Sequence, residues 1–95
     1  MIKDFTDFEV WQMASDLVCD VYQLSSHFPG DERYELTSQA RRSTNSFAAN
    51  LPEASGRFHY KDKVNFLFNA RGSLEETRSH LIIAKKCNYL SPKEK

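Results

Sequence analysis

The sequence predicts an all-α fold, an up-down antiparallel helical bundle of the four-helix type in which three long helices are present and the fourth is missing or only begun. Three long segments repeat apolar residues at helical spacing, and no stretch alternates with period two. Ser91-Pro92-Lys93-Glu94 has the cap, proline and glutamate of a helix start. We therefore expect a truncated four-helix bundle or a three-helix unit completed by a partner; the alternative for the tail is a chance S-P-x-E.

Ninety-five residues are enough for one domain, so residues 1–95 are predicted to form a single bundle. A chain this short buries a small share of its surface, which favours oligomerisation. The expected elements are helix 1 at about 7–27, helix 2 at about 32–56 with a kink near Pro52, helix 3 at about 61–87, and the start of a truncated fourth helix at about 92–95.

The first helix has the clearest predicted start. Thr6 and Glu9 have the spacing of a capping box, and Phe5 and Val10 that of a hydrophobic staple. Pro29-Gly30 is expected to end the helix. Its apolar seam follows four-three steps typical of left-handed bundle packing, at Val10, Ala14, Leu17, Val21, Leu24 and Phe28.

The second segment has mostly small inward positions, which let neighbouring helix backbones approach closely. Pro52 costs roughly 3 kcal/mol or more inside a helix, so we expect a kink near 48–52; the alternative is a break with Asn50 as a fresh cap and Glu53 closing its box. The third segment repeats Val64, Leu67, Ala70, Leu74, Thr77, Leu81 and Ala84. Asn88 follows it, where a left-handed residue is expected.

The sequence contains no enzyme constellation. Glu76 and His80 lack the second pair that a di-metal bundle needs, no serine has a nucleophile-elbow context, and "RGS" has too few glycines for a phosphate loop. We therefore expect no catalytic residue, no metal and no cofactor. Cys19 and Cys87 are interpreted as buried or partly buried thiols in a reducing cytosol. No secretory signal or membrane-spanning run is visible, so a cytoplasmic protein is expected.

The charges are strongly divided along the chain. Residues 1–35 carry eight acids and two bases, and the remaining sixty carry eleven bases and five acids. Such basic groups, with aromatic residues near them, can neutralise phosphates and stack on unpaired bases; solvated faces or ion pairs with the acidic first helix are the alternative. The candidate nucleic-acid-binding residues are Arg41, Arg42, Arg57, Tyr60, Lys61, Lys63, Arg71, Arg78 and Lys85.

Several separated blocks resemble one known family. They are "DFEVWQMA", Phe28-Pro29, "RYELTSQARRS", "AN" with Glu53 and "GR", "FLFNARGSLEET" and "NYLS". From Phe5 to Leu90 the chain resembles the four-helix bundle proteins encoded by intervening sequences in bacterial 23S rRNA genes, sometimes labelled ribosomal. Accessory proteins of diversity-generating retroelements are related. The structural polar and motif positions of this resemblance are Asn50, Glu53, Gly56, Arg71, Gly72 and Ser73.

The resemblance implies a homopentamer with a basic surface able to bind nucleic acid, without known catalysis. It also implies a possible reverse transcriptase or other protein partner, and no membrane. The sequence departs from the family at Ala48, where a proline is usual, at Asn88, where a glycine is usual, and in the missing fourth helix. We expect that absence to leave an exposed groove lined by seam residues.

The expected function is thus a non-enzymatic oligomeric scaffold that binds structured RNA or DNA through a basic surface. The alternative is a pure protein–protein interaction module, in which the basic helices dock the acidic first helix of a neighbouring subunit or partner.

Overall fold

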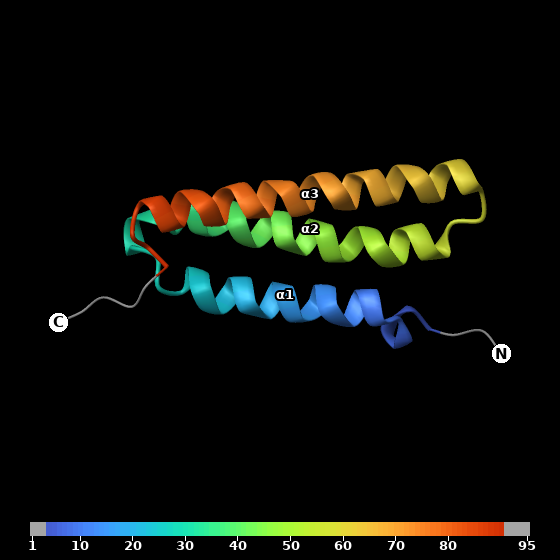
Figure 1. The fold of residues 1–95 in the computed structure, drawn as a ribbon, viewed down its shortest axis with the longest axis horizontal. Helices are drawn as coiled ribbons and strands as arrows, with labels where there is room; N and C mark the ends of the chain where they lie inside the picture. Colours follow the sequence, from blue (N-terminus) through green and yellow to red (C-terminus); the bar gives the residue numbers. More distant parts are fainter. Residues whose placement is uncertain (1–3, 91–95) are drawn as a thin grey trace.

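The computed structural model describes residues 4–90, and these form a three-helix bundle with an up-down-up course (Figure 1). No strand occurs within them, so the all-α prediction is confirmed. The fourth-helix start expected at 92–95 lies outside the described residues. The helices are α1 (Glu9–Ser25), α2 (Leu36–Gly56) and α3 (Tyr60–Lys86), with short 3-10 helices η1 (Phe5–Asp7) before α1 and η2 (Gly30–Glu32) before α2.

The start of α1 differs from the predicted capping box. Phe8 is the N-cap residue and its backbone is extended. Its apolar side chain provides no capping hydrogen bond. Thr6 lies one turn earlier in η1, where its hydroxyl donates to the Asp4 carboxylate. The capping-box prediction was wrong because Thr6 lies inside η1 and Phe8 takes the N-cap position of α1. The Phe5 ring contacts Trp11 edge-on, with 5.3 Å between centroids.

α2 begins later than predicted but runs unbroken through its proline. Glu35 has a non-helical backbone, and the Glu32 carboxylate accepts a hydrogen bond from the Leu36 amide at 3.2 Å. Pro52 lies inside the helix, and the Asn50 side-chain amide donates to the Ser46 carbonyl at 2.8 Å rather than capping a new helix. The alternative of a break at Asn50 was therefore wrong, and the kink near 48–52 stays a prediction.

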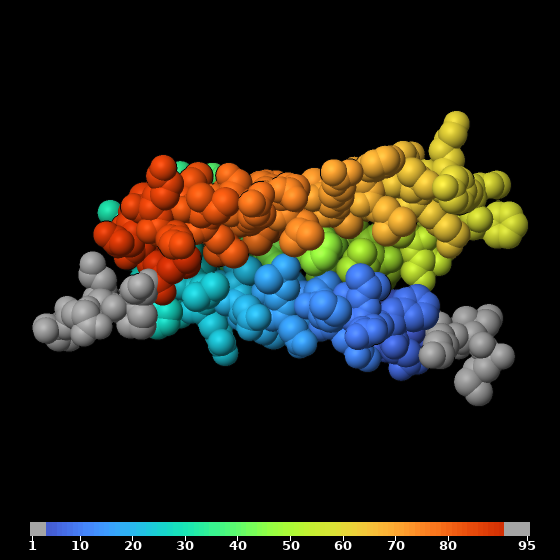
Figure 2. Space-filling model, in the orientation of Figure 1, coloured from blue at the N-terminus to red at the C-terminus, as the bar shows by residue number. Residues whose placement is uncertain are grey.

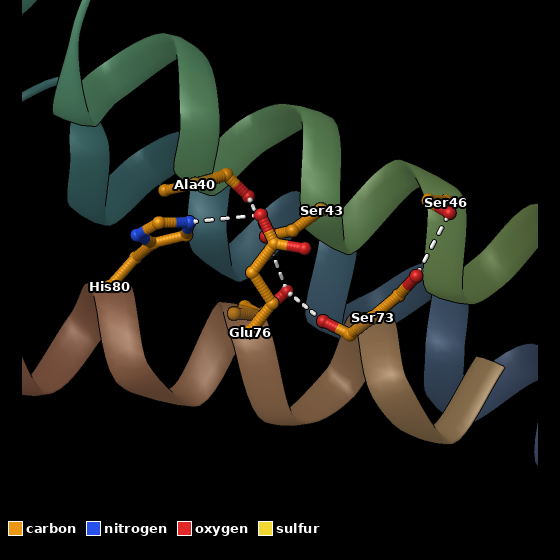
Figure 3. A network of polar contacts seen from close by, with 7 residues as sticks. Ala40, Ser43, Ser46, Ser73, Glu76 and His80 are labelled. Carbon is orange, nitrogen blue, oxygen red and sulfur yellow. Dashed lines mark hydrogen bonds and ion pairs between the residues drawn. The ribbon is translucent and has the colours of Figure 1, made fainter. Parts of the chain in front are cut away.

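α2 and α3 pack closely along their length, as Figure 1 shows, because small side chains lie between them. The buried positions are Thr37, Ala40, Ser43, Thr44 and Ala54 on α2 and Ala70, Thr77 and Ala84 on α3. Hydroxyls bridge the two helices at Ser43–Thr77, 2.7 Å apart, and at Ser46–Ser73, 2.9 Å apart (Figure 3). This agrees with the predicted close approach of backbones at small residues.

α1 packs on α2 and makes no comparable contact with α3. Ala14, Val21 and Ser25 are its buried residues. The Asn45 amide of α2 also donates to the Tyr22 hydroxyl of α1 at 2.9 Å, which adds a polar contact to the α1–α2 packing. α1 and α3 each pack mainly on α2 and make little contact with each other. Their apolar seams are therefore only partly covered.

The end of α3 confirms the predicted role of Asn88. Its φ is 65°, the left-handed region that asparagine tolerates. The Tyr89 amide donates to the Ala84 carbonyl at 2.8 Å, and the Asn88 amide donates to the Lys85 carbonyl at 3.0 Å. These two hydrogen bonds are those of a Schellman motif, which satisfies the last carbonyls of a helix.

Candidate functional site: basic side chains, the α2–α3 turn and the α1–α3 groove

Three of the nine predicted nucleic-acid-binding side chains are held by contacts within the chain. The Arg41 guanidinium donates to Ser25 Oγ at 2.7 Å and to the Tyr22 carbonyl at 3.3 Å, and lies 4.7 Å from the centre of the Tyr22 ring. A cation is favourable at the C-terminus of α1, where carbonyls point outward. Arg41 therefore holds α1 to α2, and its guanidinium is engaged by neutral partners within the chain.

Arg57 and Lys63 are engaged in the same way at the C-terminus of α2. Arg57 pairs with Glu53 at 3.0 Å and lies over the Phe66 ring at 4.6 Å. Lys63 Nζ donates to the carbonyls of Ala54 and Ser55, each at 3.4 Å. The Arg57 pair is about half exposed, so an approaching phosphate can compete with Glu53.

The remaining cations are exposed and open to a ligand. Within residues 4–90, Arg42, Lys61, Arg71 and Lys85 form no side-chain hydrogen bond or ion pair. Arg78 lies 3.5 Å from Glu75, with more than 60% of both side chains exposed, a pair of little energetic weight. Arg71, Arg78 and Lys85 are seven residues apart along α3 and so follow one face of the helix.

Two aromatic side chains stand out from the α2–α3 turn. Phe58 is 91% exposed and Tyr60 is 80% exposed. The His59 ring meets Phe58 edge-on, with 5.3 Å between centroids. Arg57 and Lys61 flank the pair, so the stretch "RFHYK" offers two free rings between two cations. Phe58 was missed as a sequence candidate, although this alternation of basic and aromatic residues was available to find it.

A long apolar groove runs between α1 and α3, with α2 as its floor. Its largest hollow has a volume of about 500 Å³ and its lining includes Val10, Leu17, Phe47 and Leu74. Two further hollows of about 330 and 300 Å³ continue it toward Leu90 and toward η1. Figure 2 looks onto this face, where the green atoms of α2 are visible between α1 and α3. The predicted groove of seam residues is thus present.

The groove has one acidic and one basic rim. Asp16 and Asp20 of α1 line the largest hollow. Arg78 and Lys85 of α3 line the next, and Arg71 lies on the same face of that helix. Several apolar side chains of the groove are also substantially exposed: Val10 at 56%, Met13 at 64%, Leu67 at 49%, Leu74 at 36% and Ile82 at 46%.

The family-motif residues divide between contacts inside the bundle and exposed positions. Asn50 donates to the Ser46 carbonyl, and Ser73 bonds to Ser46 across the helix contact. Glu53, in contrast, is exposed and pairs with Arg57. Gly56 and Gly72 face open space, where an added Cβ meets nothing within 4 Å. Of the two polar candidates, only Asn50 is held within the bundle.

The described residues bring no group of metal ligands together. No cluster of three or more histidine, cysteine, aspartate or glutamate side chains occurs within residues 4–90. His80 lies 3.3 Å from Glu76 on α3, in a single pair (Figure 3).

Cys19 and Cys87 are both exposed, so the prediction of buried or partly buried thiols was wrong. The heptad period alone does not reveal which side of a helix lacks a neighbour. None of the described helices is long and apolar enough to cross a membrane.

Comparison with known families gives one match that spans nearly the whole chain. Residues 6–95 match the family described as 23S rRNA-intervening sequence protein. The chain belongs to this family. The match covers α1, α2 and α3, and it is the same family that the sequence blocks resemble. No curated protein matches the chain.

Proposed function

We propose that this member of the 23S rRNA-intervening sequence family is a non-enzymatic helical scaffold that binds structured RNA or DNA. The observation that carries the proposal is the α2–α3 turn, where Phe58 and Tyr60 are exposed between Arg57 and Lys61. Exposed aromatic rings stack on unpaired bases, and the adjacent cations neutralise phosphates. The free cations Arg42, Arg71 and Lys85 extend the basic surface away from this turn.

The ligand favoured by this geometry is a folded nucleic acid with an unpaired loop. Two rings at one end of the bundle can hold one or two splayed bases, while a duplex stem reaches cations farther along α3 by its phosphates. No base-reading motif is present, so affinity is expected to depend on loop shape and charge rather than on a fixed sequence.

The test is fluorescence anisotropy with a hairpin RNA that has a single-stranded loop. Affinity of the wild-type chain should fall steeply between 50 and 200 mM salt, as counterion release requires. The Phe58→Ala/Tyr60→Ala variant should bind more weakly by about 1–3 kcal/mol per stacked base. Tyr34→Ala is the matched control, because Tyr34 is 81% exposed at the other end of the bundle. Salt-independent affinity, or equal losses in both variants, would refute the proposal.

A second function, docking of another protein, is favoured by the α1–α3 groove. We propose that the basic rim of α3 docks an acidic helix such as α1 of a neighbouring subunit or partner, while the apolar floor supplies the buried area. Charge reversal at Arg71 and Arg78 should then dissociate the assembly in size-exclusion light scattering. The homopentamer and a reverse transcriptase partner, both implied by the family resemblance, stay predictions.

The two functions can be separated by variants that affect only one of them. Reversal of Asp16 and Asp20 changes the acidic rim of the groove and leaves the α2–α3 turn intact, whereas Phe58→Ala/Tyr60→Ala changes the turn alone. Loss of RNA binding in the second variant with unchanged mass supports the nucleic-acid function. Loss of assembly in the first with unchanged RNA affinity supports docking.

A further inference from the structure

We propose that the α1–α3 groove binds one helix of another protein, whose apolar face is bordered by basic side chains toward α1 and by acidic side chains toward α3. We call this ligand the two-sided helix. The inference rests on the docking function above and adds a basic flank to its acidic partner helix. Each groove takes one helix, so the proposal places no limit on the number of chains in an assembly.

The apolar lining of the groove repeats at helical spacing. α1 and α3 run in the same direction along the bundle (Figure 1). Val10 and Leu67 line one hollow together, and Leu17 and Leu74 together line the two larger ones. The two pairs are seven residues apart on both helices, which is about 10 Å along the axis. A ligand helix with apolar residues at heptad spacing therefore meets one pair after the other.

The length of the lining sets the length of the ligand. Leu81 lines the hollow beyond Leu74, so the apolar wall of α3 extends from Leu67 to Leu81. At 1.5 Å per residue this is about 21 Å. Phe47 of α2 lies beneath the middle of this stretch and forms part of the floor. A helix of about 21 residues covers the wall and leaves roughly one turn beyond each end.

The acidic rim has no cation of its own. Asp16 and Asp20 are exposed on α1 and line the largest hollow beside Leu17. Neither carboxylate forms an ion pair within residues 4–90, and α1 contains no lysine or arginine. A basic flank on the ligand would give these two carboxylates a partner at the edge of an apolar contact.

The basic rim lies on α3, across the groove from these acids. Arg78 and Lys85 line the second hollow, and Arg71 lies one heptad before Arg78. Their seven-residue spacing is also the period of a ligand that lies along the groove. Acidic side chains that recur every seven residues on the ligand can therefore pair with the three cations in turn.

A neighbouring α1 would match only one half of this charge pattern. It carries Glu9, Asp16 and Asp20, which can pair with the basic rim, but it has no base for the acidic rim. A helix with acids on both flanks is repelled by the aspartates of the groove, whereas a two-sided helix pairs with both rims. The charges of the groove thus select a two-sided helix.

The test uses three synthetic peptides of about 21 residues that share one leucine face at heptad spacing. The two-sided peptide has lysine on one flank and glutamate on the other, and the comparison peptides have glutamate on both flanks or lysine on both. Calorimetric titration of the full chain should give one peptide bound per chain. The two-sided peptide should bind about fivefold or more tightly than either comparison peptide.

The free peptides are matched before they are mixed with the protein. Sedimentation velocity gives the concentration at which each peptide is a single chain, because helices with a heptad leucine face can associate with one another. Circular dichroism checks that the three peptides have similar helical content, so that a difference in affinity reports the flanks.

Charge reversal of a rim should change the preferred peptide. Asp16→Lys/Asp20→Lys makes both rims basic, so the peptide with glutamate on both flanks should become the tightest ligand. Arg71→Glu/Arg78→Glu makes most of the basic rim acidic, so the peptide with lysine on both flanks should become the tightest. This exchange of preference follows only if both rims contact the ligand.

Lys61→Glu/Lys86→Glu is the matched control. It changes the charge of α3 by the same amount at exposed residues outside the lining of the three hollows, so the two-sided peptide should stay preferred. Circular dichroism checks that each variant folds. If the reversal of the acidic rim prevents folding, Asp16→Asn/Asp20→Asn replaces it and should abolish the preference for the two-sided peptide over the peptide with glutamate on both flanks.

The outcomes separate this inference from the docking function. If the peptide with glutamate on both flanks binds the wild type most tightly and Asp16→Lys/Asp20→Lys changes nothing, the two-sided helix is overturned and docking on the basic rim stands. If no peptide binds while Arg71→Glu/Arg78→Glu still dissociates an assembly of the chain, the occupant is a second copy and the inference is overturned. If no peptide binds and neither reversal changes the mass, both proposals are overturned.

Discussion

The phenol of Tyr89 donates a hydrogen bond to the carboxylate of Glu32 over 3.1 Å, although 57 residues separate them in the sequence. The second carboxylate oxygen of Glu32 accepts from the Leu36 amide at the start of α2. The Tyr89 ring also packs on Phe28, with 5.8 Å between centroids. One acid therefore caps α2 and holds the end of α3 against the connection between α1 and α2.

We expect this contact to make stability depend on pH. The hydrogen bond to Glu32, with a smaller effect of desolvation, raises the pKa of Tyr89 above its usual value of 10.0. Because the folded chain holds this proton more tightly than the unfolded chain, the contribution is fully present below pH 10 and is lost as pH rises through the folded pKa. Urea unfolding of wild type and Tyr89→Phe should differ at pH 8 and converge at higher pH.

Tyr34→Phe is the control for this experiment. It removes an exposed phenol whose oxygen has no hydrogen-bond partner within residues 4–90, so its unfolding should follow the wild type at every pH. A difference between wild type and Tyr89→Phe that does not change from pH 8 upward would show that the Glu32 contact is not coupled to ionisation.

The hydroxyls of Ser43 and Thr77 should behave as a coupled pair. They lie 2.7 Å apart, and each also faces a carbonyl one turn back, Ala40 for Ser43 and Ser73 for Thr77. Each hydroxyl has one proton, so one of them bonds across the helices while the other bonds within its own helix. Removal of one partner should cost about 1 kcal/mol, and Ser43→Ala/Thr77→Val should cost less than the sum of the single changes. Urea unfolding of the four chains gives the coupling, and strict additivity would contradict it.

Thr44→Val should stabilise the chain. Thr44 is fully buried, and its Oγ1 has no hydrogen-bond partner among the described residues. Valine keeps the shape and removes the buried hydroxyl, which should raise the free energy of unfolding by about 1–2 kcal/mol. Thr44→Ala is the comparison, because it removes the same hydroxyl but leaves a cavity and should destabilise. A loss of stability in the valine variant would show that the hydroxyl is paired in solution.

The sequence predicted those features of the fold that depend on local chemistry and period. Four-three spacing placed three helices and their seams, small residues marked the α2–α3 contact, and Asn88 marked a left-handed helix end. These predictions succeed because a helix face and a C-terminal cap are determined by residues within one or two turns.

Other features depend on partners that are distant in the sequence. Glu32 accepts a hydrogen bond from Tyr89, 57 residues away, and Arg41 and Lys63 donate to carbonyls at the ends of other helices, so these roles do not follow from spacing. The α1 start was predicted wrongly for a local reason, because Thr6 is part of η1 and α1 begins only after Phe8. The sequence named the basic positions of the candidate site. It did not show which of them border the groove, because that depends on how α1 and α3 lie relative to each other.

Replacement of the proline in α2 gives the last prediction. Pro52 has no amide hydrogen to donate toward Ala48, yet α2 continues through it. Pro52→Ala restores that donor, and the loss of some packing against Phe5 and Trp11 in the neighbouring hollow offsets part of the gain. We expect a net stabilisation of about 1–3 kcal/mol by urea unfolding. Gln39→Ala is the control, because Gln39 is exposed on α2 and its backbone amide donates to the Glu35 carbonyl. This change should alter the free energy of unfolding by only about a few tenths of a kcal/mol. Equal stability of Pro52→Ala and wild type would mean that the packing of the proline ring balances the missing hydrogen bond.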